Sequence, residues 1–208
     1  MARHYAVNLV VEGRRCLVVG GGPVAARKAQ GLRDAGAAVT VVAERVGEEV
    51  AALDGVEVAE RAYRTGDLDG RRLVISATDD PGLNARVYAE ADGAGLWVCS
   101  ADDPDHCSFT LPSILRRGTL QVAVSTGGRS PAVAAWLRRR LEAEIGPEYG
   151  VLVDVLADER ATWRAAGHST EGLDWRRALE SDMLVLIREG HVDRAREQLH
   201  ECLSSSSG

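Results

Sequence analysis

Short apolar runs alternate with longer amphipathic stretches in the first half of the chain. The runs rich in β-branched residues predict five strands, at residues 16–20, 38–43, 56–59, 72–77 and 96–101. Helical patterns between them predict helices at residues 23–35 and 81–91, where Pro23 suits a first turn and Gly36 suits a helix end. Strands that alternate with helices are typical of βαβ units, so we predict an α/β fold with a doubly wound parallel sheet.

The pattern changes after residue 105. Residues 108–111 and 120–125 read as two strands with no helix between them. A loop then leads into a helix that Ser130 caps and Pro131 begins. This helix carries apolar residues at every fourth position: Val133, Leu137, Leu141 and Ile145. Such a stripe must be buried, and we expect a second copy of the chain to cover it.

The remainder of the chain reads as helices only. They are predicted at residues 149–164, 175–188 and 192–203, followed by an unstructured tail at residues 204–208. We therefore predict three regions. These are a sheet domain at residues 1–112, a dimerisation segment made of strands and a helix at residues 113–147, and a small all-helical C-terminal domain at residues 148–208.

Composition places the chain among folded globular proteins. Of its 208 residues, 45% are hydrophobic and 27% are charged, which disfavours a disordered or fibrous protein. The apolar runs are too short for a membrane span, and residues 1–11 lack an export signal, so we expect a cytoplasmic protein that does not enter membranes. The four cysteines show no CxxC spacing and are predicted to be thiols rather than disulfides or zinc ligands.

Charge is unevenly distributed along the chain. The net charge is −6, and most of the acidic excess lies in residues 148–208. Residues 113–141 contain no acid and six arginines: Arg116, Arg117, Arg129, Arg138, Arg139 and Arg140. Aromatic residues make up only 4% of the chain, which disfavours a nucleic-acid partner because few bases can stack. A site for a small polyanion fits this segment better.

A glycine-rich turn follows the first predicted strand. Gly20, Gly22 and Ala25 fit the pattern GxGxxA between a strand and a helix, which is the context of a dinucleotide pyrophosphate site. Glu44 follows the second strand, where a carboxylate binds ribose hydroxyls. NAD is therefore the predicted cofactor, and a Rossmann-type domain the predicted fold. NADP is the rival ligand because of Arg45, and a glycine turn that only packs is the alternative without a ligand.

Two further polar segments follow strand ends. Residues 76–80, with Thr78 among them, are placed to line the nicotinamide side, although Asp79 and Asp80 also suit the cap of the next helix. Asp102, Asp103 and Asp105 follow the fifth strand. Their mutual repulsion can raise the pKa of one carboxyl and suit it to proton transfer, but surface acidic turns are common and from the residues alone are the preferred interpretation.

Five stretches taken together resemble the precorrin-2 dehydrogenase and sirohydrochlorin ferrochelatase family, which includes the N-terminal module of siroheme synthase. They are GGGPVAARK at residues 20–28, SATDD at 76–80, DDPDHCSF at 102–109, LPS at 111–113 and AVSTGGRSP at 123–131. The resemblance implies a homodimer that oxidises precorrin-2 to sirohydrochlorin with NAD, and in some members inserts ferrous iron.

The resemblance also implies roles for individual residues. It places the catalytic carboxylate on Asp102, and dinucleotide contacts on Pro23, Val24, Glu44 and Arg45. The strand before Asp102 departs from the family pattern of Asn-Val-Val and reads Cys-Ser-Ala here.

The substrate that the family takes is a polycarboxylate, because precorrin-2 carries acetate and propionate groups. Cations and N–H donors of the basic segment would bind them. The predicted substrate-binding residues are Arg116, Arg117, Ser125, Thr126, Arg129 and Ser130.

Two other interpretations remain open from the sequence. One is a non-catalytic NAD-sensing module, which would need neither the acidic cluster nor the arginines. The other concerns Asp102, Asp105, His106 and Cys107, which could briefly hold ferrous iron, although a capped turn fits this loop better. The histidines show no metal-ligand spacing, so no stored metal is expected.

Overall fold

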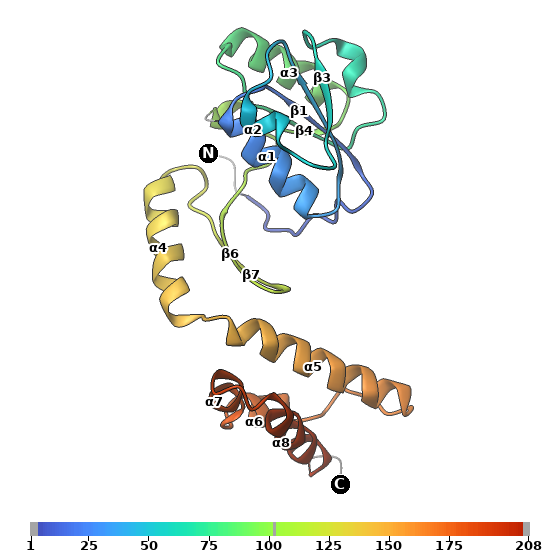
Figure 1. Cartoon of the computed structure of the whole chain (residues 1–208), viewed down its shortest axis with the longest axis vertical. Coiled ribbons are helices and arrows are strands. Elements are labelled where there is room, and N and C mark those ends of the chain that lie inside the picture. Colours follow the sequence, from blue (N-terminus) through green and yellow to red (C-terminus); the bar gives the residue numbers. More distant parts are fainter. Residues whose placement is uncertain (1–3, 102, 206–208) are drawn as a thin grey trace. The chain divides into compact units, whose positions relative to one another are not determined.

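A computed structural model describes residues 4–101 and 103–205 of the chain (Figure 1). The chain divides into two compact units, residues 1–111 and residues 112–208. Within the described residues, no helix is both long and apolar enough to cross a membrane.

The first unit contains a five-stranded sheet in which every pairing is parallel. Its strands, in chain order, are β1 (Arg15–Val19), β2 (Ala38–Ala43), β3 (Glu57–Glu60), β4 (Leu73–Ser76) and β5 (Trp97–Ser100). They lie in the order β3-β2-β1-β4-β5, so the chain reverses its winding direction between β1 and β4. The predicted doubly wound parallel sheet is confirmed. Ligands of such sheets bind outside the carboxyl ends of the strands at this switch point.

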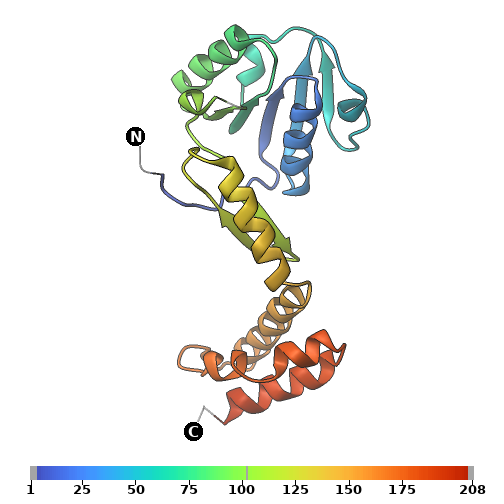
Figure 2. The ribbon, with the colours of Figure 1, turned by 90° about the vertical axis from the view of Figure 1, so that its left-hand side faces the viewer.

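Helices cover both faces of the sheet. The elements are α1 (Pro23–Asp34), α2 (Glu48–Ala51), the 3₁₀ turn η1 (Thr65–Leu68), α3 (Pro81–Gly93) and the 3₁₀ turn η2 (Pro104–His106). Figure 2 shows α1, in blue, and α3, in green, on opposite sides of the sheet. In β1, Cys16 and Val18 belong to the core beneath α1, whereas Leu17 and Val19 belong to the core beneath α3. Burial on both faces explains why this strand is apolar at successive positions.

A bidentate ion pair fixes the turn after β3. Asp67 accepts hydrogen bonds from both terminal nitrogens of Arg61, at 2.6 and 2.9 Å, and one from the backbone N–H of Arg64 at 2.8 Å. The hydrogen bonds from Arg61 lower the pKa of the Asp67 carboxyl. The Asp67 side chain is 10% exposed and that of Arg61 is 36% exposed, so water screens the pair from one side.

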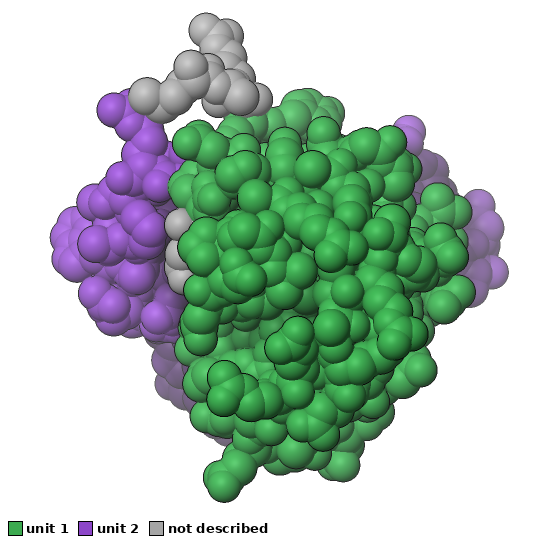
Figure 3. Space-filling view, turned by 90° about the horizontal axis from the view of Figure 1, so that it is seen from above, with its two compact units in different colours: residues 1–111 green, residues 112–208 purple. Residues whose placement is uncertain are grey.

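The second unit, purple in Figure 3, begins with a β-hairpin. It pairs β6 (Ser113–Arg117) with β7 (Leu120–Val124) in an antiparallel ladder. Helix α4 (Pro131–Glu144) packs against both strands. The Arg117 guanidinium donates from Nε to the Ile145 carbonyl at 2.8 Å and from Nη2 to the Glu142 carbonyl at 3.4 Å, which fixes the end of α4 to the hairpin.

The predicted strand at residues 108–111 is wrong, because the hairpin strand begins five residues later at Ser113. Ser108 continues along the free edge of β5 instead. Its backbone N–H donates to the Val98 carbonyl at 2.8 Å, and its hydroxyl accepts from the Val98 N–H at 2.8 Å. Phe109 then packs against the core beneath α1. The new ladder starts directly after Pro112, whose ring nitrogen has no hydrogen to donate.

Four helices complete the second unit: α5 (Glu148–Ala165), α6 (Trp175–Leu179), α7 (Met183–Arg188) and α8 (Val192–Ser204). They enclose a separate apolar core that includes Leu152, Met183 and Leu199. The predicted single helix at residues 175–188 is two helices. The Ser181 hydroxyl donates to the Ala178 carbonyl at 2.6 Å, and this side-chain bond competes with the helical pattern where α6 ends.

We predict that Asp67→Asn lowers the free energy of unfolding by about 1 kcal/mol at neutral pH, because it removes the charge that Arg61 faces. The folded-state pKa of Asp67 is below its unfolded value of about 3.9, so this stabilisation is present above that pH and disappears as the pH falls through the folded pKa. Urea unfolding of both proteins at neutral and acidic pH measures it. The control is Asp69→Asn in the same turn, whose side chain is exposed. A difference that stays constant on acidification would contradict the ion-pair explanation.

Candidate functional site

The glycine-rich turn after β1 is held in a very close approach of backbones. A Cβ atom on Gly20, which has φ +134°, would lie 2.2 Å from the Ala77 carbonyl oxygen. A Cβ atom on Gly21 would lie 1.9 Å from the Arg45 carbonyl oxygen. The Gly47 N–H donates to the Gly21 carbonyl at 2.9 Å. Glycine at positions 20 and 21 therefore brings the segments after β2 and β4 against the end of β1.

The start of α1 is open and suits an anion. Gly22 precedes the helix as its N-cap, and a Cβ added there would meet nothing within 4 Å. No side chain of the described residues caps α1, and Pro23 occupies its first turn. Val24 is half-buried and Ala25 is fully buried beneath the helix, which permits close packing on the sheet. This open, uncapped helix start fits a dinucleotide pyrophosphate, whose charge the amide groups and helix dipole stabilise.

Two charged side chains flank the glycine turn. Glu44 and Arg45 directly follow β2, and both are exposed. The Arg45 carbonyl contacts the turn at Gly21, so the backbone that carries these side chains is fixed relative to it. A carboxylate at this position fits ribose hydroxyl groups. The predicted contacts of both residues with a dinucleotide stay predictions.

The segment after β4 is locked by a side chain that sequence reasoning missed. Asn84, on α3, accepts from the Thr78 hydroxyl at 2.8 Å and donates to the Thr78 carbonyl at 2.9 Å. Asp80 caps α3 by accepting from the backbone N–H groups of Gly82 and Leu83, as the capping alternative proposed. The hydroxyl of Thr78 is thus used in shaping the turn, and its predicted role toward NAD stays a prediction. An asparagine four residues after a cap was the available signal.

Sequence reasoning also missed a pair of serines that lies between the carboxyl ends of β4 and β5. Ser76 and Ser100 face each other in the ladder, and their hydroxyl oxygens are 2.7 Å apart. Both residues are buried, at 0% and 2% exposure, so the two hydroxyls satisfy each other in a place that water does not reach. The pair ties the strand that ends before Thr78 to the strand that ends before the acidic loop.

In the acidic loop after β5, the described residues form a turn that Asp103 caps. Asp102, the predicted catalytic residue, lies outside the described residues. Asp103 accepts from the backbone N–H of Asp105 at 3.2 Å, and its carboxylate lies 2.6 Å from Nδ1 of His106. This bond to His106 lowers the pKa of Asp103. The His106 ring contacts the Tyr88 ring edge-on at 5.0 Å between centroids. The carboxylate of Asp103 is therefore used to shape the loop.

The predicted substrate-binding residues all lie in the second unit. Arg116 and Arg129 are exposed. Arg117 already donates from all three guanidinium nitrogens, to the carbonyls of Arg116, Glu142 and Ile145. Gly127 and Gly128 have φ of +63° and +78°, which folds the loop before α4 into a compact turn.

The three hydroxyl residues of this loop also have local partners. The Ser125 hydroxyl accepts from the Gly127 N–H, the Thr126 hydroxyl from the Ser130 N–H, and the Ser130 hydroxyl from the Val133 N–H. Ser130 thereby caps α4 as expected. Substrate binding by this set of six residues stays a prediction.

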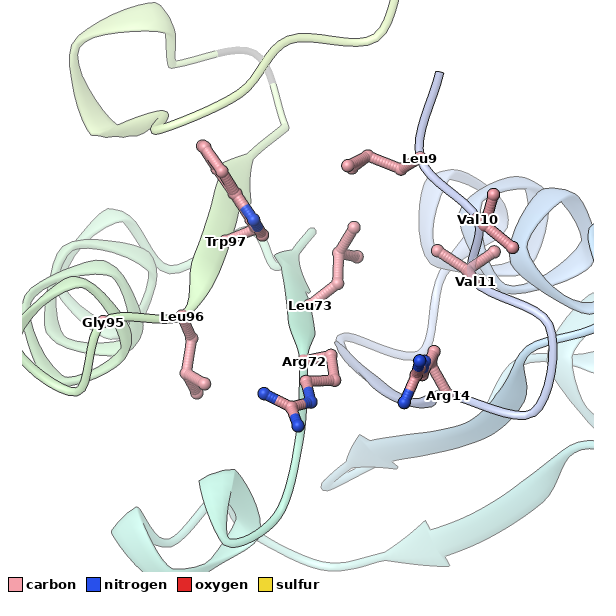
Figure 4. A pocket seen from close by; sticks show the side chains of 9 residues that line it. All are labelled: Leu9, Val10, Val11, Arg14, Arg72, Leu73, Gly95, Leu96 and Trp97. Carbon is pink, nitrogen blue, oxygen red and sulfur yellow. The ribbon is translucent and has the colours of Figure 1, made fainter. Parts of the chain in front are cut away.

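A pocket of about 240 Å³ lies in the first unit where β4 and β5 begin, at the end of the sheet opposite to the glycine turn (Figure 4). It is lined by Leu9, Val10, Val11, Arg14, Arg72, Leu73, Gly95, Leu96 and Trp97. Leu73 and Trp97 are the first residues of β4 and β5, whereas the glycine turn, Glu44 and Thr78 follow strand ends. This pocket is therefore distinct from the candidate dinucleotide site.

Two family models match the chain. One, described as "Putative NAD(P)-binding", matches residues 7–113, and the other, "Sirohaem biosynthesis protein central", matches residues 117–144. The first model spans more than half of the chain and covers every predicted dinucleotide contact.

Named relatives agree with these matches. The siroheme synthase of Thioalkalivibrio sulfidiphilus (strain HL-EbGR7) is 41% identical over 206 residues, which are 97% of this chain and 42% of that protein. The siroheme synthase of Pseudomonas entomophila (strain L48) is 51% identical over 150 residues, or 71% of this chain and 32% of that protein. This chain thus spans less than half the length of these relatives.

A solved structure, "SirC, precorrin-2 dehydrogenase", is similar with a TM-score of 0.70 and 27% identity, over 96% of this chain and 98% of that one. The fold class and the family resemblance predicted from the sequence are confirmed, and NAD is supported as the cofactor.

We predict that Gly22→Val abolishes NAD binding without unfolding the protein. The added side chain meets no protein atom near its Cβ, but it would fill the open space at the start of α1 where we expect the pyrophosphate to bind. Calorimetric titration with NAD measures the loss. The matched control is Gly31→Val on the same helix, where a Cβ is equally free of contacts. Unchanged NAD affinity in Gly22→Val would place the cofactor elsewhere.

Proposed function

This chain belongs to the NAD(P)-binding family of siroheme biosynthesis, and from that membership we propose that it oxidises precorrin-2 to sirohydrochlorin with NAD. The observation that carries the proposal is the uncapped, open start of α1 beside the glycine turn, in a chain that both family models match. A non-catalytic NAD-sensing module would share this turn. Mixing the protein with NAD and precorrin-2 without oxygen separates the two, because only a dehydrogenase changes the absorbance of both compounds.

The cofactor side of the reaction is assigned to the first unit. Gly20, Gly22 and the first-turn amides of α1 hold the pyrophosphate, and Glu44 accepts hydrogen bonds from ribose hydroxyls. The negative charge of Glu44 disfavours a 2′-phosphate and so favours NAD over NADP, although Arg45 offers a cation next to it. When bound, NAD accepts a hydride from the substrate.

We propose Asp102 as the general base that accepts the proton lost by the substrate. The carboxyl end of β5 lies next to that of β4, which borders the switch point between β1 and β4, and Asp102 follows β5 by two residues in sequence. Asp103 is a weaker candidate because its carboxylate already caps η2 and binds His106. Asp105 is exposed in the same loop and serves as the comparison.

The substrate side is assigned to the basic segment. Arg116 and Arg129 are exposed cations, and guanidinium groups bind carboxylates through paired hydrogen bonds. Arg117, Ser125, Thr126 and Ser130 shape the hairpin and the loop from which these cations project. We propose that together they hold the acetate and propionate groups of precorrin-2.

A homodimer is proposed from the exposed face of α4. Val133 is 45% exposed, Trp136 48% and Leu137 36%, and among the described residues of α4 only Ala134 is buried. A two-stranded hairpin with one helix buries little apolar surface by itself. We therefore propose residues 113–147 as the dimerisation segment, between an NAD-binding domain at residues 1–112 and a helical domain at residues 148–208.

We propose ferrous iron only as a secondary substrate. The loop after β5, which the sequence indicated as a possible iron site, is a turn in which Asp103 caps η2 and bonds to His106. Among the described residues, no group of three or more His, Cys, Asp or Glu side chains is arranged to hold a metal. A cytoplasmic location stays a prediction.

We predict that Asp102→Asn lowers the dehydrogenase turnover by about 10²–10⁴-fold, the usual cost of losing a general base. NAD affinity and assembly should not change, because the substitution is nearly isosteric and distant from the glycine turn in sequence. Stopped-flow absorbance under anaerobic conditions measures turnover. Asp105→Asn, in the same loop, is the control and should retain activity. Wild-type turnover in Asp102→Asn would remove this carboxylate from the mechanism.

We predict that Leu137→Asp converts the dimer to a monomer, because the interface would bury a carboxylate without a partner. Sedimentation velocity at micromolar concentration measures the mass. Leu179→Asp on α6 is the matched control, since Leu179 is 49% exposed and lies outside the proposed dimerisation segment. A wild-type protein that sediments as a monomer would refute the proposed dimer.

A further inference from the structure

Two cysteines that are eight residues apart in sequence lie side by side at the free edge of the sheet. Cys99, in β5, faces Cys107 across an isolated antiparallel bridge, and their sulfur atoms are 3.4 Å apart. The Ser108 N–H donates to the Val98 carbonyl next to this pair. That bond makes Cys99 and Cys107 a non-hydrogen-bonded pair of the ladder, the type in which opposed side chains are closest.

This geometry suits a disulfide. Opposed residues of a non-hydrogen-bonded pair have Cα atoms roughly 4.5 Å apart, and disulfides span Cα separations of about 4.4–6.8 Å. The sulfur atoms need to approach from 3.4 Å to about 2.05 Å, which small side-chain rotations can supply. The loop between the two cysteines is already folded back by η2, so closing it requires no large rearrangement.

The surroundings of Cys107 favour the reactive thiolate. Its hydrogen bond with Cys99 lowers the pKa of Cys107 to about 7, against the opposing effect of burial. The nearby His106 acts in the same direction, and the Asp103 carboxylate opposes it. The Cys107 thiol also donates to the carbonyl oxygens of Ser100 and Asp103, at 3.3 and 3.2 Å. Cys107 is half-buried, whereas Cys99 is 7% exposed. A low-pKa thiol with some access and a second thiol beside it is the arrangement of redox-sensing cysteines.

We propose that Cys99 and Cys107 are a redox modification site, at which peroxide forms a reversible disulfide that slows the enzyme. The Cys107 thiolate attacks one peroxide oxygen, the O–O bond breaks, and the hydroxide that leaves takes up a proton to become water. The Cys99 thiol then attacks the sulfenic sulfur, and a second water leaves as the S–S bond forms. In total, two thiols lose two electrons and two protons, and hydrogen peroxide becomes two waters.

The effect on turnover follows from what the disulfide encloses. The closed loop contains Asp102 and η2, so the bond constrains the segment that carries the proposed base. Displacing a catalytic group by about 1 Å can cost on the order of 10²-fold in rate. This part of the inference rests on the proposed function, whereas formation of the disulfide does not.

Peptide mass spectrometry tests the disulfide without any substrate. Trypsin releases both cysteines in one peptide, residues 87–116, and releases Cys16 and Cys202 in two others. After treatment of the whole protein with hydrogen peroxide and then a maleimide, we expect peptide 87–116 to weigh two hydrogen atoms less and to carry no maleimide. Dithiothreitol should restore both thiols. A peptide that stays fully alkylated while Cys202 is oxidised would overturn the proposal.

Variants assign the two roles. Cys99→Ser should leave Cys107 without a resolving thiol, so peroxide should drive it to the sulfinic acid. Cys107→Ser should leave Cys99 able to react with the maleimide after unfolding. Cys202→Ser is the matched control and should form the disulfide as the wild type does. Sulfinic acid at Cys99 in Cys107→Ser, together with an unoxidised Cys107 in Cys99→Ser, would overturn the assignment.

Turnover is measured on the same samples. We expect oxidation to slow precorrin-2 dehydrogenation by about tenfold or more, dithiothreitol to restore it, and Cys107→Ser to be insensitive to peroxide. A disulfide that forms without changing turnover would overturn the regulatory role. A reduced wild-type protein that is inactive toward precorrin-2 would instead refute the proposed function, and the mass of peptide 87–116 would still decide the redox site.

Discussion

The site depends on one close approach of backbone segments, at the point where β1 ends. Any side chain at Gly20 or Gly21 would collide with a carbonyl oxygen, of Ala77 and Arg45 respectively. Without Cβ atoms there, the segments after β2 and β4 contact the turn directly, and three strand ends converge. That convergence places Glu44, the start of α1 and the Thr78 turn at one edge of the sheet. A looser packing of the same five strands would separate these groups and leave no common surface for a dinucleotide.

Most of the first unit could be predicted from sequence because four of its five strands, all except β3, are buried along most of their length. Continuous apolar runs such as residues 16–20 leave few alternatives once glycine turns and helical patterns flank them. The strand at residues 108–111 was wrong for a related reason. Phe109 is apolar because it packs against a core, and Ser108 bonds to an edge strand, so the segment has strand character without a hairpin partner.

The parts of the candidate site that depend on local backbone conformation were predictable from sequence. The contacts between side chains that are distant in sequence were not. The glycine turn and the Asp80 and Ser130 caps follow from local rules of spacing. The Asn84 bonds to Thr78 and the buried Ser76 and Ser100 pair depend on which residues the fold brings together. The Cys99 and Cys107 pair was missed for the same reason, since its spacing matches no metal or redox motif.

The Ser108 contacts with β5 bear on solubility as well as on the loop. β5 is an edge strand, and an edge that leaves N–H and C=O groups free can pair with strands of other molecules. The Ser108 backbone and hydroxyl occupy both polar groups of Val98 on that side. The segment that forms the acidic loop therefore also shields the sheet from self-association. A substitution that frees Ser108 from β5 would expose a template for aggregation, so loss of soluble protein at this position would not by itself indicate a catalytic role.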